Sequence, residues 1–251
     1  MLTTMMLFAM SGAALAAEQT YTTKDLNEQL VMATLWYQRS AEMRALQYQA
    51  YNVARIVFDA HLEKGAFDKK RAVVVDIDET ILDNSPYEAG LIGENFGYPK
   101  GWGEWINEAR AAAVPGAVEF LNYALSKGAD IFYISNIKVR YKEVTMMKLK
   151  NLGFPQVMDA HVLLREETSD KAPRRQIVQK DHTIVLLMGD NLNDFDSIFR
   201  KKGVSDRSAA VDLSKEKFGT KFIVLPNPMY GDWEGAVYNY NWKLSPKEKS
   251  E

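Results

Sequence analysis

The chain has 251 residues, and its 31 Lys and Arg residues nearly balance its 33 Asp and Glu residues. It carries no long basic stripe of the kind that binds nucleic acid, so no nucleic-acid partner is expected. The absence of cysteine excludes thiolate catalysis, disulfides, cysteine-ligated zinc and a lipid anchor on an N-terminal cysteine. A hydrophobic content of 47% is ordinary for a chain that folds around a real core.

The first residues have the pattern of an export signal. An apolar stretch is followed by Ala14, Leu15 and Ala16, which match an A-x-A cleavage site. No Lys or Arg precedes that stretch, and a start codon placed too far downstream would explain the missing charge. We expect residues 1–17 to be a signal peptide and the mature protein to be periplasmic or secreted. No later segment approaches the roughly 20 apolar residues of a membrane span, so the mature protein is expected to contain none.

The next part of the chain has the periodicity of helices. Apolar residues keep helical spacing up to about residue 62, which predicts two helices, and Asp25 with Glu28 three residues later suggests a capping box. We assign residues 22–66 to the N-terminal helical segment of a smaller helical domain. Residues 229–251 are expected to pack on that domain.

Short β-branched runs alternate with helical segments through residues 70–228. These runs are residues 72–77, 131–134, 162–164, 184–188 and 222–225. Continuous apolar strands separated by helices are buried on both faces, which is typical of a parallel sheet. The predicted fold class is therefore α/β, with a Rossmann-like parallel sheet flanked by helices.

Two pairs of acids follow strands of this predicted sheet, Asp76 with Asp78 and Asp190 with Asp194. Ligands of parallel sheets bind outside the carboxyl ends of the strands, where both pairs are expected to meet. Crowded carboxylates at the rim of a low-dielectric sheet repel each other and lose solvation. A hard divalent cation relieves that conflict, and oxygen ligands without His or Cys suit Mg²⁺. The sequence therefore predicts a Mg²⁺ site at this edge.

The order of the motifs D-I-D-E-T, S-N, a lysine and G-D-N-L-N-D-F resembles the haloacid dehalogenase (HAD) superfamily. The longer stretches VVDIDETILDNSPY and IVLLMGDNLNDF resemble both halves of the signature of class C (DDDD-type) bacterial acid phosphatases, a secreted group. The resemblance runs from about residue 22 to residue 242. It implies a HAD-like core over residues 70–228 with a cap inserted at about residues 84–113, and it alone suggests a homodimer.

The resemblance also implies roles for the four acids. Asp76 would be the nucleophile that forms an aspartyl-phosphate, and its carboxylate would bind the metal. Asp78 would act as general acid and then as general base, while its backbone carbonyl binds the metal. Asp190 would be the remaining direct carboxylate ligand. Asp194 would hold a metal-bound water rather than the metal itself.

Three further residues would bind the phosphoryl group. Ser135 and Asn136 would donate hydrogen bonds to it, and Lys171 would neutralise its oxygens together with the nucleophile. Composition alone interprets Lys171, Arg174 and Arg175 as the solvated start of a helix, so the role of Lys171 follows mostly from the resemblance.

Tyr87, Trp102 and Tyr230 are candidates for an aromatic slot that stacks a base or ring of the substrate. The alternative is core packing, because Trp and Tyr often serve as large apolar anchors with one polar tip. The two interpretations are evenly matched for Trp102 and Tyr230, whereas the position of Tyr87 beside the acids favours a functional role.

Three functions remain open from the sequence. The leading one is an exported, Mg²⁺-dependent acid phosphatase of broad activity on phosphomonoesters, with nucleoside monophosphates and aryl phosphates as candidate substrates. The second is a dedicated 5′-nucleotidase or phosphotransferase in cofactor salvage. The third is a non-catalytic binding or storage protein, although homologues of that kind lose the nucleophile and Asp76 is present here. His61, His161 and His182 adjoin no motif, which argues against acid phosphatases that use a histidine nucleophile.

Overall fold

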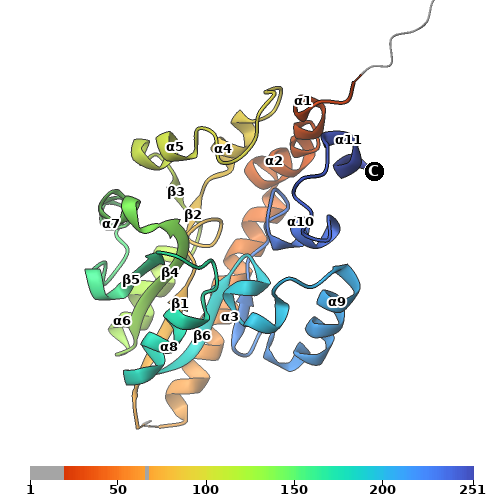
Figure 1. Cartoon of the computed structure of the whole chain (residues 1–251). Coiled ribbons are helices and arrows are strands. Elements are labelled where there is room, and N and C mark those ends of the chain that lie inside the picture. The colour runs from red at the N-terminus through yellow and green to blue at the C-terminus, as the bar shows by residue number, and fades with distance from the viewer. Residues whose placement is uncertain (1–19, 66–67) are drawn as a thin grey trace, which may run out of the picture.

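The computed structural model describes residues 20–65 and 68–251, so the expected signal peptide lies outside the described residues (Figure 1). Within these ranges, no helix combines the length and the hydrophobicity that crossing a membrane requires.

A five-stranded parallel sheet forms the centre of the molecule, in the order β5-β4-β1-β6-β7. The strands are β1 (Lys70–Val75), β4 (Asp130–Lys138), β5 (Val162–Arg165), β6 (His182–Gly189) and β7 (Phe222–Val224). All five predicted runs are thus strands, and the predicted α/β class is confirmed. Because β1 is the middle strand of the sheet, Val75 lies opposite both Tyr133 of β4 and Met188 of β6, and the residue after β1 lies between these two neighbouring strands.

Helices cover both faces of the sheet. The flanking helices are α3 (Ala41–Glu63), α6 (Ala117–Ser126), α7 (Lys142–Asn151), α8 (Ala172–Asp181) and α9 (Val204–Leu213). Val73 and Val75 join the core beneath α3 and α6, whereas Val74 joins a second core beneath α8 and α9. Because side chains alternate along a strand, β1 is buried on both sides.

The N-terminal segment forms three helices, not the two predicted. They are α1 (Thr23–Asn27), α2 (Leu30–Arg39) and α3. The division between α2 and α3 occurs because Ser40 has extended backbone and its side chain accepts a hydrogen bond from the Met43 N–H, 3.0 Å away. The proposed capping box is also displaced, since Asp25 accepts from the Thr22 N–H rather than pairing with Glu28.

The insertion after β1 lies beyond the carboxyl end of the sheet (Figure 1). It holds α4 (Ser85–Gly90) and α5 (Trp102–Glu108), and a small antiparallel pair, β2 (Leu82–Asp83) with β3 (Ala112–Ala113), closes its base. These two-residue strands are too short to show a sequence period. Asn27 Nδ2 lies 2.8–3.0 Å from three carbonyl oxygens of the insertion, which ties α1 to it.

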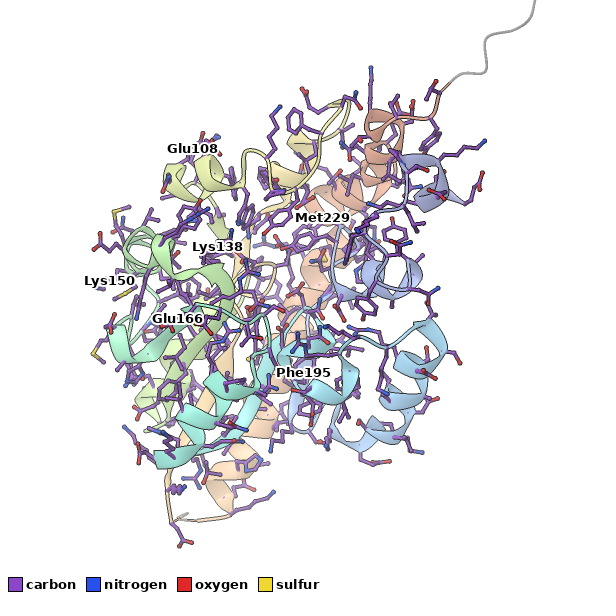
Figure 2. All side chains as sticks on the ribbon, in the orientation of Figure 1. Glu108, Lys138, Lys150, Glu166, Phe195 and Met229 are labelled. Carbon is purple, nitrogen blue, oxygen red and sulfur yellow. The ribbon has the colours of Figure 1, made fainter. Side chains whose placement is uncertain are left out.

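The C-terminal segment returns to the N-terminal helices. Its helices are α10 (Asp232–Val237) and α11 (Pro246–Ser250), and α11 contacts α1 (Figure 1). Met229 packs with Tyr37 and Met43 near α10 (Figure 2). The division of the chain into domains stays a prediction. The residues that the structure describes also include five short 3₁₀ helices: Val139–Tyr141, Asp159–His161, Leu192–Asp194, Ser197–Phe199 and Lys215–Lys217.

Candidate active site

Lys171 joins the two acid motifs. Its Nζ atom lies 2.5 Å from Asp76 Oδ1 and 2.6 Å from Asp194 Oδ1. Burial would lower the pKa of this ammonium, but the two carboxylates outweigh that effect and raise it, so Lys171 stays charged. Arg174 and Arg175 are buried as well, at 8% and 7% exposure. The composition-based interpretation of these three residues as a solvated helix start is therefore wrong.

Asp76 occupies the first position after β1. It is 8% exposed, and its N–H donates to the Met188 carbonyl over 2.9 Å, which continues the pairing of β1 with β6 by one residue. The carboxylate is thus fixed by the central strand while its partner Lys171 arrives from the start of α8.

Asp78 is held by the insertion. Its Oδ1 atom accepts a hydrogen bond of 2.9 Å from Asn84 Nδ2, and Asn84 Oδ1 in turn accepts from Trp105 Nε1 over 2.8 Å. Burial, and then the negative charge of Asp76, raises the pKa of Asp78 to about 7. A carboxyl group of this kind can carry a proton in the pH range where an acid–base catalyst is needed.

Asp76, Asp190 and Asp194 each offer a carboxylate oxygen, and the three oxygens lie within 4.8 Å of one another. Burial raises the pKa of Asp190 well above its usual value, and repulsion from Asp194 and Asp76 adds to the rise. A group of three hard oxygen donors, two buried and one partly buried, with mutual repulsion fits a divalent cation such as Mg²⁺. The Lys171 ammonium supplies one positive charge to this group through its ion pairs with Asp76 and Asp194.

Gly189 makes room for this cluster. A Cβ atom at residue 189 would lie 2.5 Å from Asp194 Cβ and 2.7 Å from Asp194 Cγ, far inside van der Waals contact. Only glycine therefore allows Asp194 to lie back over the end of β6, where its Oδ2 accepts from the Asn191 N–H over 3.0 Å.

Ser135 and Asn136 lie at the carboxyl end of β4, which continues to Lys138 instead of ending before them. Ser135 is fully buried, with Oγ 3.5 Å from Asp78 Oδ2. Asn136 is exposed, and its Oδ1 accepts a 2.8 Å hydrogen bond from Arg174 Nη2. Because a guanidinium can only donate, this contact turns the amide nitrogen of Asn136 away from Arg174 and keeps it available as a donor.

The three predicted aromatic residues are not equivalent. Tyr87 and Trp102 meet edge to face with ring centroids 5.0 Å apart, and the Tyr87 hydroxyl donates to the Lys100 carbonyl over 3.0 Å. The Tyr230 hydroxyl donates instead to Glu79 Oε2. Among the residues described, the structure records no ring contact between Tyr230 and Trp102, so it brings together two of the three.

Sequence reasoning missed several polar residues around the acids. Glu79 is fully buried, and its Oε1 atom accepts from the Asn84 N–H over 2.7 Å. Asn227 Nδ2 donates to Asp190 Oδ2 over 2.8 Å. Lys148 on α7 is 5% exposed and feels the charges of Asp78 and Glu79. Glu79 lies inside the D-I-D-E-T motif and could have been found there, whereas no local pattern distinguishes Asn227 or Lys148 from surface residues.

The fold and the acid cluster match a known enzyme family. A family model described as HAD superfamily, subfamily IIIB (acid phosphatase), matches residues 5–233. The chain belongs to this acid phosphatase family. The resemblance inferred from the motifs and the enzyme class are thereby confirmed.

Solved structures agree with this assignment. The class C acid phosphatase from Bacillus anthracis is 51% identical, with a TM-score of 0.86 over 90% of this chain and 94% of that chain. A second structure of that phosphatase, with tungstate bound, is 50% identical, with a TM-score of 0.87 over 90% and 95% of the two chains. The stem 31 kDa glycoprotein of Glycine max is 28% identical over 165 residues, 62% of this chain and 58% of that protein. The match to the stem 31 kDa glycoprotein thus covers less than two thirds of that protein's length.

Proposed function

We propose that the protein is a Mg²⁺-dependent acid phosphatase that hydrolyses phosphomonoesters through a phosphorylated Asp76. The observation that carries the proposal is the Lys171 ammonium shared between Asp76 and Asp194, next to a third carboxylate from Asp190. This arrangement combines a nucleophile, a fixed positive charge and a group of cation ligands at one sheet edge.

In the first step, a carboxylate oxygen of Asp76 attacks phosphorus as the bond to the leaving oxygen breaks, and Asp78 gives its proton to that oxygen. In the second step, Asp78 takes a proton from water, whose oxygen attacks the aspartyl-phosphate and releases inorganic phosphate and Asp76. Lys171 offsets the charge of the nucleophile in both steps, and Asn136 and Ser135 are available to donate to the phosphoryl oxygens.

Asp76, Asp190 and the backbone carbonyl of Asp78 would hold Mg²⁺. When bound, Mg²⁺ would neutralise charge on the phosphoryl oxygens. Asp194, in the same cluster, shares Lys171 with Asp76 and would hold a water on the cation. Tungstate is a tetrahedral oxyanion like phosphate, and its presence in the similar Bacillus anthracis structure supports an oxyanion site in this fold.

The test is release of phosphate from p-nitrophenyl phosphate, measured with Mg²⁺, with a chelator and after Mg²⁺ is restored. Asp76→Asn keeps the shape of the side chain but removes the attacking charge, so turnover should disappear while the circular dichroism spectrum is unchanged. The exposed Asp206→Asn variant is the matched control and should keep full activity. Retention of a tenth of wild-type turnover by Asp76→Asn would refute the assigned nucleophile.

The contact between Tyr87 and Trp102 favours substrates that carry a ring, such as nucleoside monophosphates and aryl phosphates. A steep preference for nucleotides over aryl phosphates would support the alternative of a dedicated 5′-nucleotidase or a phosphotransferase in cofactor salvage. Equal kcat/KM for ring-bearing and alkyl phosphates would argue for broad specificity without stacking.

Export to the periplasm or the medium is a further part of the proposal, supported by the A-x-A pattern before Ala17. N-terminal sequencing of the protein from its native host should begin at or near Ala17, and an intact Met1 would contradict export. A homodimer and the absence of a nucleic-acid partner are proposed with it. Light scattering tests the dimer, and a mobility-shift assay tests binding of nucleic acid.

A further inference from the structure

Arg207 on α9 is a buried cation that touches no substrate-binding residue named above. It is 7% exposed. Its guanidinium lies 3.2 Å from Asn191 Oδ1, 3.4 Å from Asn193 Oδ1, 2.6 Å from the Phe199 carbonyl and 2.8 Å from Asp232 Oδ2. A buried guanidinium with four acceptors fixes all of them, because its donors lie in one rigid plane.

The first loop that Arg207 contacts carries Asp190 and Asp194, two of the three clustered acids. Asn191 directly follows Asp190, and Asn193 directly precedes Asp194. Arg175 holds the same loop through its backbone, donating to the Asp194 carbonyl over 2.8 Å. Arg207 therefore holds this loop by hydrogen bonds to its side chains, and Arg175 holds it by a hydrogen bond to its main chain.

The second loop that Arg207 contacts reaches the site from the C-terminal segment. Asp232, its ion-pair partner, also accepts a 2.8 Å hydrogen bond from the Tyr240 hydroxyl. Five residues before Asp232, Asn227 donates to Asp190, and two residues before it Tyr230 donates to Glu79. Arg207 thus links the Asp190–Asp194 loop to the segment that supplies donors to Asp190 and Glu79.

Glycine at residue 231 permits the two loops to meet. A Cβ atom at Gly231 would lie 3.2 Å from Asn191 Nδ2 and 2.8 Å from Trp233 Cδ1, and its φ of 156° suits glycine. Asn191 therefore contacts the C-terminal segment on one side and Arg207 on the other. The position of the Asp190–Asp194 loop depends on both contacts.

We propose that Arg207 is a positioning residue for the divalent cation. It fixes the Asp190–Asp194 loop relative to the C-terminal segment, so that the carboxylates of that loop point toward the cation site. The inference rests on the proposed function. Arg207 itself contacts none of the three clustered carboxylates in any recorded hydrogen bond or ion pair of the described residues, so its effect on the cation acts through Asn191, Asn193 and Asp232.

The experiment is calorimetric titration of the full-length protein with Mg²⁺ in the absence of substrate. Loss of a residue that orients metal ligands typically weakens metal affinity about 10- to 100-fold, and we expect a change of that size in Arg207→Met. Arg207→Lys should also bind more weakly, because an ammonium cannot span Asn191 and Asp232 as a planar fork does. The exposed Arg44→Met variant is the matched control and should titrate like the wild type.

A second readout separates positioning from general loss of structure. Raising Mg²⁺ should restore much of the kcat of Arg207→Met, since the acids are still present, whereas a misfolded site would not respond. An Mg²⁺ dissociation constant within twofold of the wild-type value in a folded Arg207→Met overturns the inference. If that variant fails to fold, Arg207→Lys decides by the same criterion. A wild type that binds no Mg²⁺ overturns the proposed function as well, so the two failures are distinguishable.

Discussion

The phenolic hydroxyl of Tyr230 donates a hydrogen bond to Oε2 of Glu79, a residue that lies 151 positions earlier in the sequence. Glu79 is fully buried, and burial, followed by the charge of Asp78, raises its pKa well above the usual value. Tyr230→Phe removes one donor from this buried group, so the free energy of unfolding should fall by about 1–3 kcal/mol in denaturant titrations. The exposed Tyr98→Phe variant should be neutral. An unchanged midpoint for Tyr230→Phe would mean that the hydrogen bond does not stabilise the fold.

Trp102 should matter most for substrates that carry a ring. Stacking of a base on an aromatic side chain contributes about 1–3 kcal/mol, so Trp102→Ala should lower kcat/KM for nucleoside monophosphates roughly 5- to 100-fold. Small alkyl phosphates should change much less. Trp242→Ala, which removes a more exposed indole, serves as the control. A uniform loss on all substrates together with a lower melting temperature would show that Trp102 is a packing residue instead.

Asp190→Asn should separate metal binding from stability. The partly buried Asp190 carboxylate is repelled by Asp194 and Asp76, so a neutral amide of the same shape should make the metal-free protein at least as stable as the wild type. Mg²⁺ should raise the melting temperature of the wild type but not that of the variant, because a ligand stabilises only what it binds. Equal Mg²⁺-induced shifts in the variant and the wild type would exclude Asp190 as a ligand.

Gly189→Ala should disable the site through one methyl group. The new Cβ would lie 2.5 Å from Asp194 Cβ and would push that side chain off the end of β6. Overpacking of this kind costs about 1–3 kcal/mol, and the displaced Asp194 should lower Mg²⁺ affinity as well. Gly97→Ala places its methyl group in open space and should leave both the melting temperature and Mg²⁺ affinity unchanged. Full activity of Gly189→Ala would show that Asp194 can move without consequence.

A second group of polar residues, at the amino ends of the strands, predicts a pH dependence of stability. Burial would raise the pKa of Asp130, but hydrogen bonds from Gln156, Lys70 and His182 outweigh it and lower the pKa to about 2. A lowered pKa in the folded state stabilises the protein above the unfolded value of about 3.9, and that contribution disappears as the pH falls toward 2.

The wild type should therefore be more stable than Asp130→Asn at pH 6, and the difference between them should shrink between about pH 4 and pH 2. Comparing the two proteins cancels the titration of acids elsewhere in the chain. Denaturant midpoints at several pH values measure the difference. A difference in denaturant midpoint between the two proteins that stays constant down to pH 2 would mean that the charge of Asp130 is not what stabilises this cluster.

The strands and the four acids could be predicted because their signals are local. A β-branched run such as residues 72–77 is recognisable in isolation, and an acid that follows it must lie at the sheet edge. The burial of Arg174 could not be predicted, since it depends on the Ser135 carbonyl and on Asn136 in a distant strand. The break between α1 and α2, at residues 28–29, was missed because the helical spacing of apolar residues continues across it from Leu26 to Leu30.

The same limit applies to the site. Glu79 is held locally by Asn84, but its hydrogen bond from Tyr230 joins segments far apart in the chain, and no spacing of residues encodes that contact. Arg207 resembles any arginine of an exposed helix until its neighbours Asn191 and Asp232 are known in space.

The position of β1 at the centre of the sheet has a consequence for the timing of activity during synthesis. Asp76 leaves the ribosome early with β1, its partner Lys171 follows 95 residues later, and the donors Asn227 and Tyr230 come last. Translation proceeds from the N-terminus, so a nascent chain that has passed Asp194 already contains every aspartate of the site, with Lys171 and Asn84, but not Asn227 and Tyr230. A ribosome-bound chain that has not yet released the segment after β7 is therefore expected to be inert toward phosphate esters.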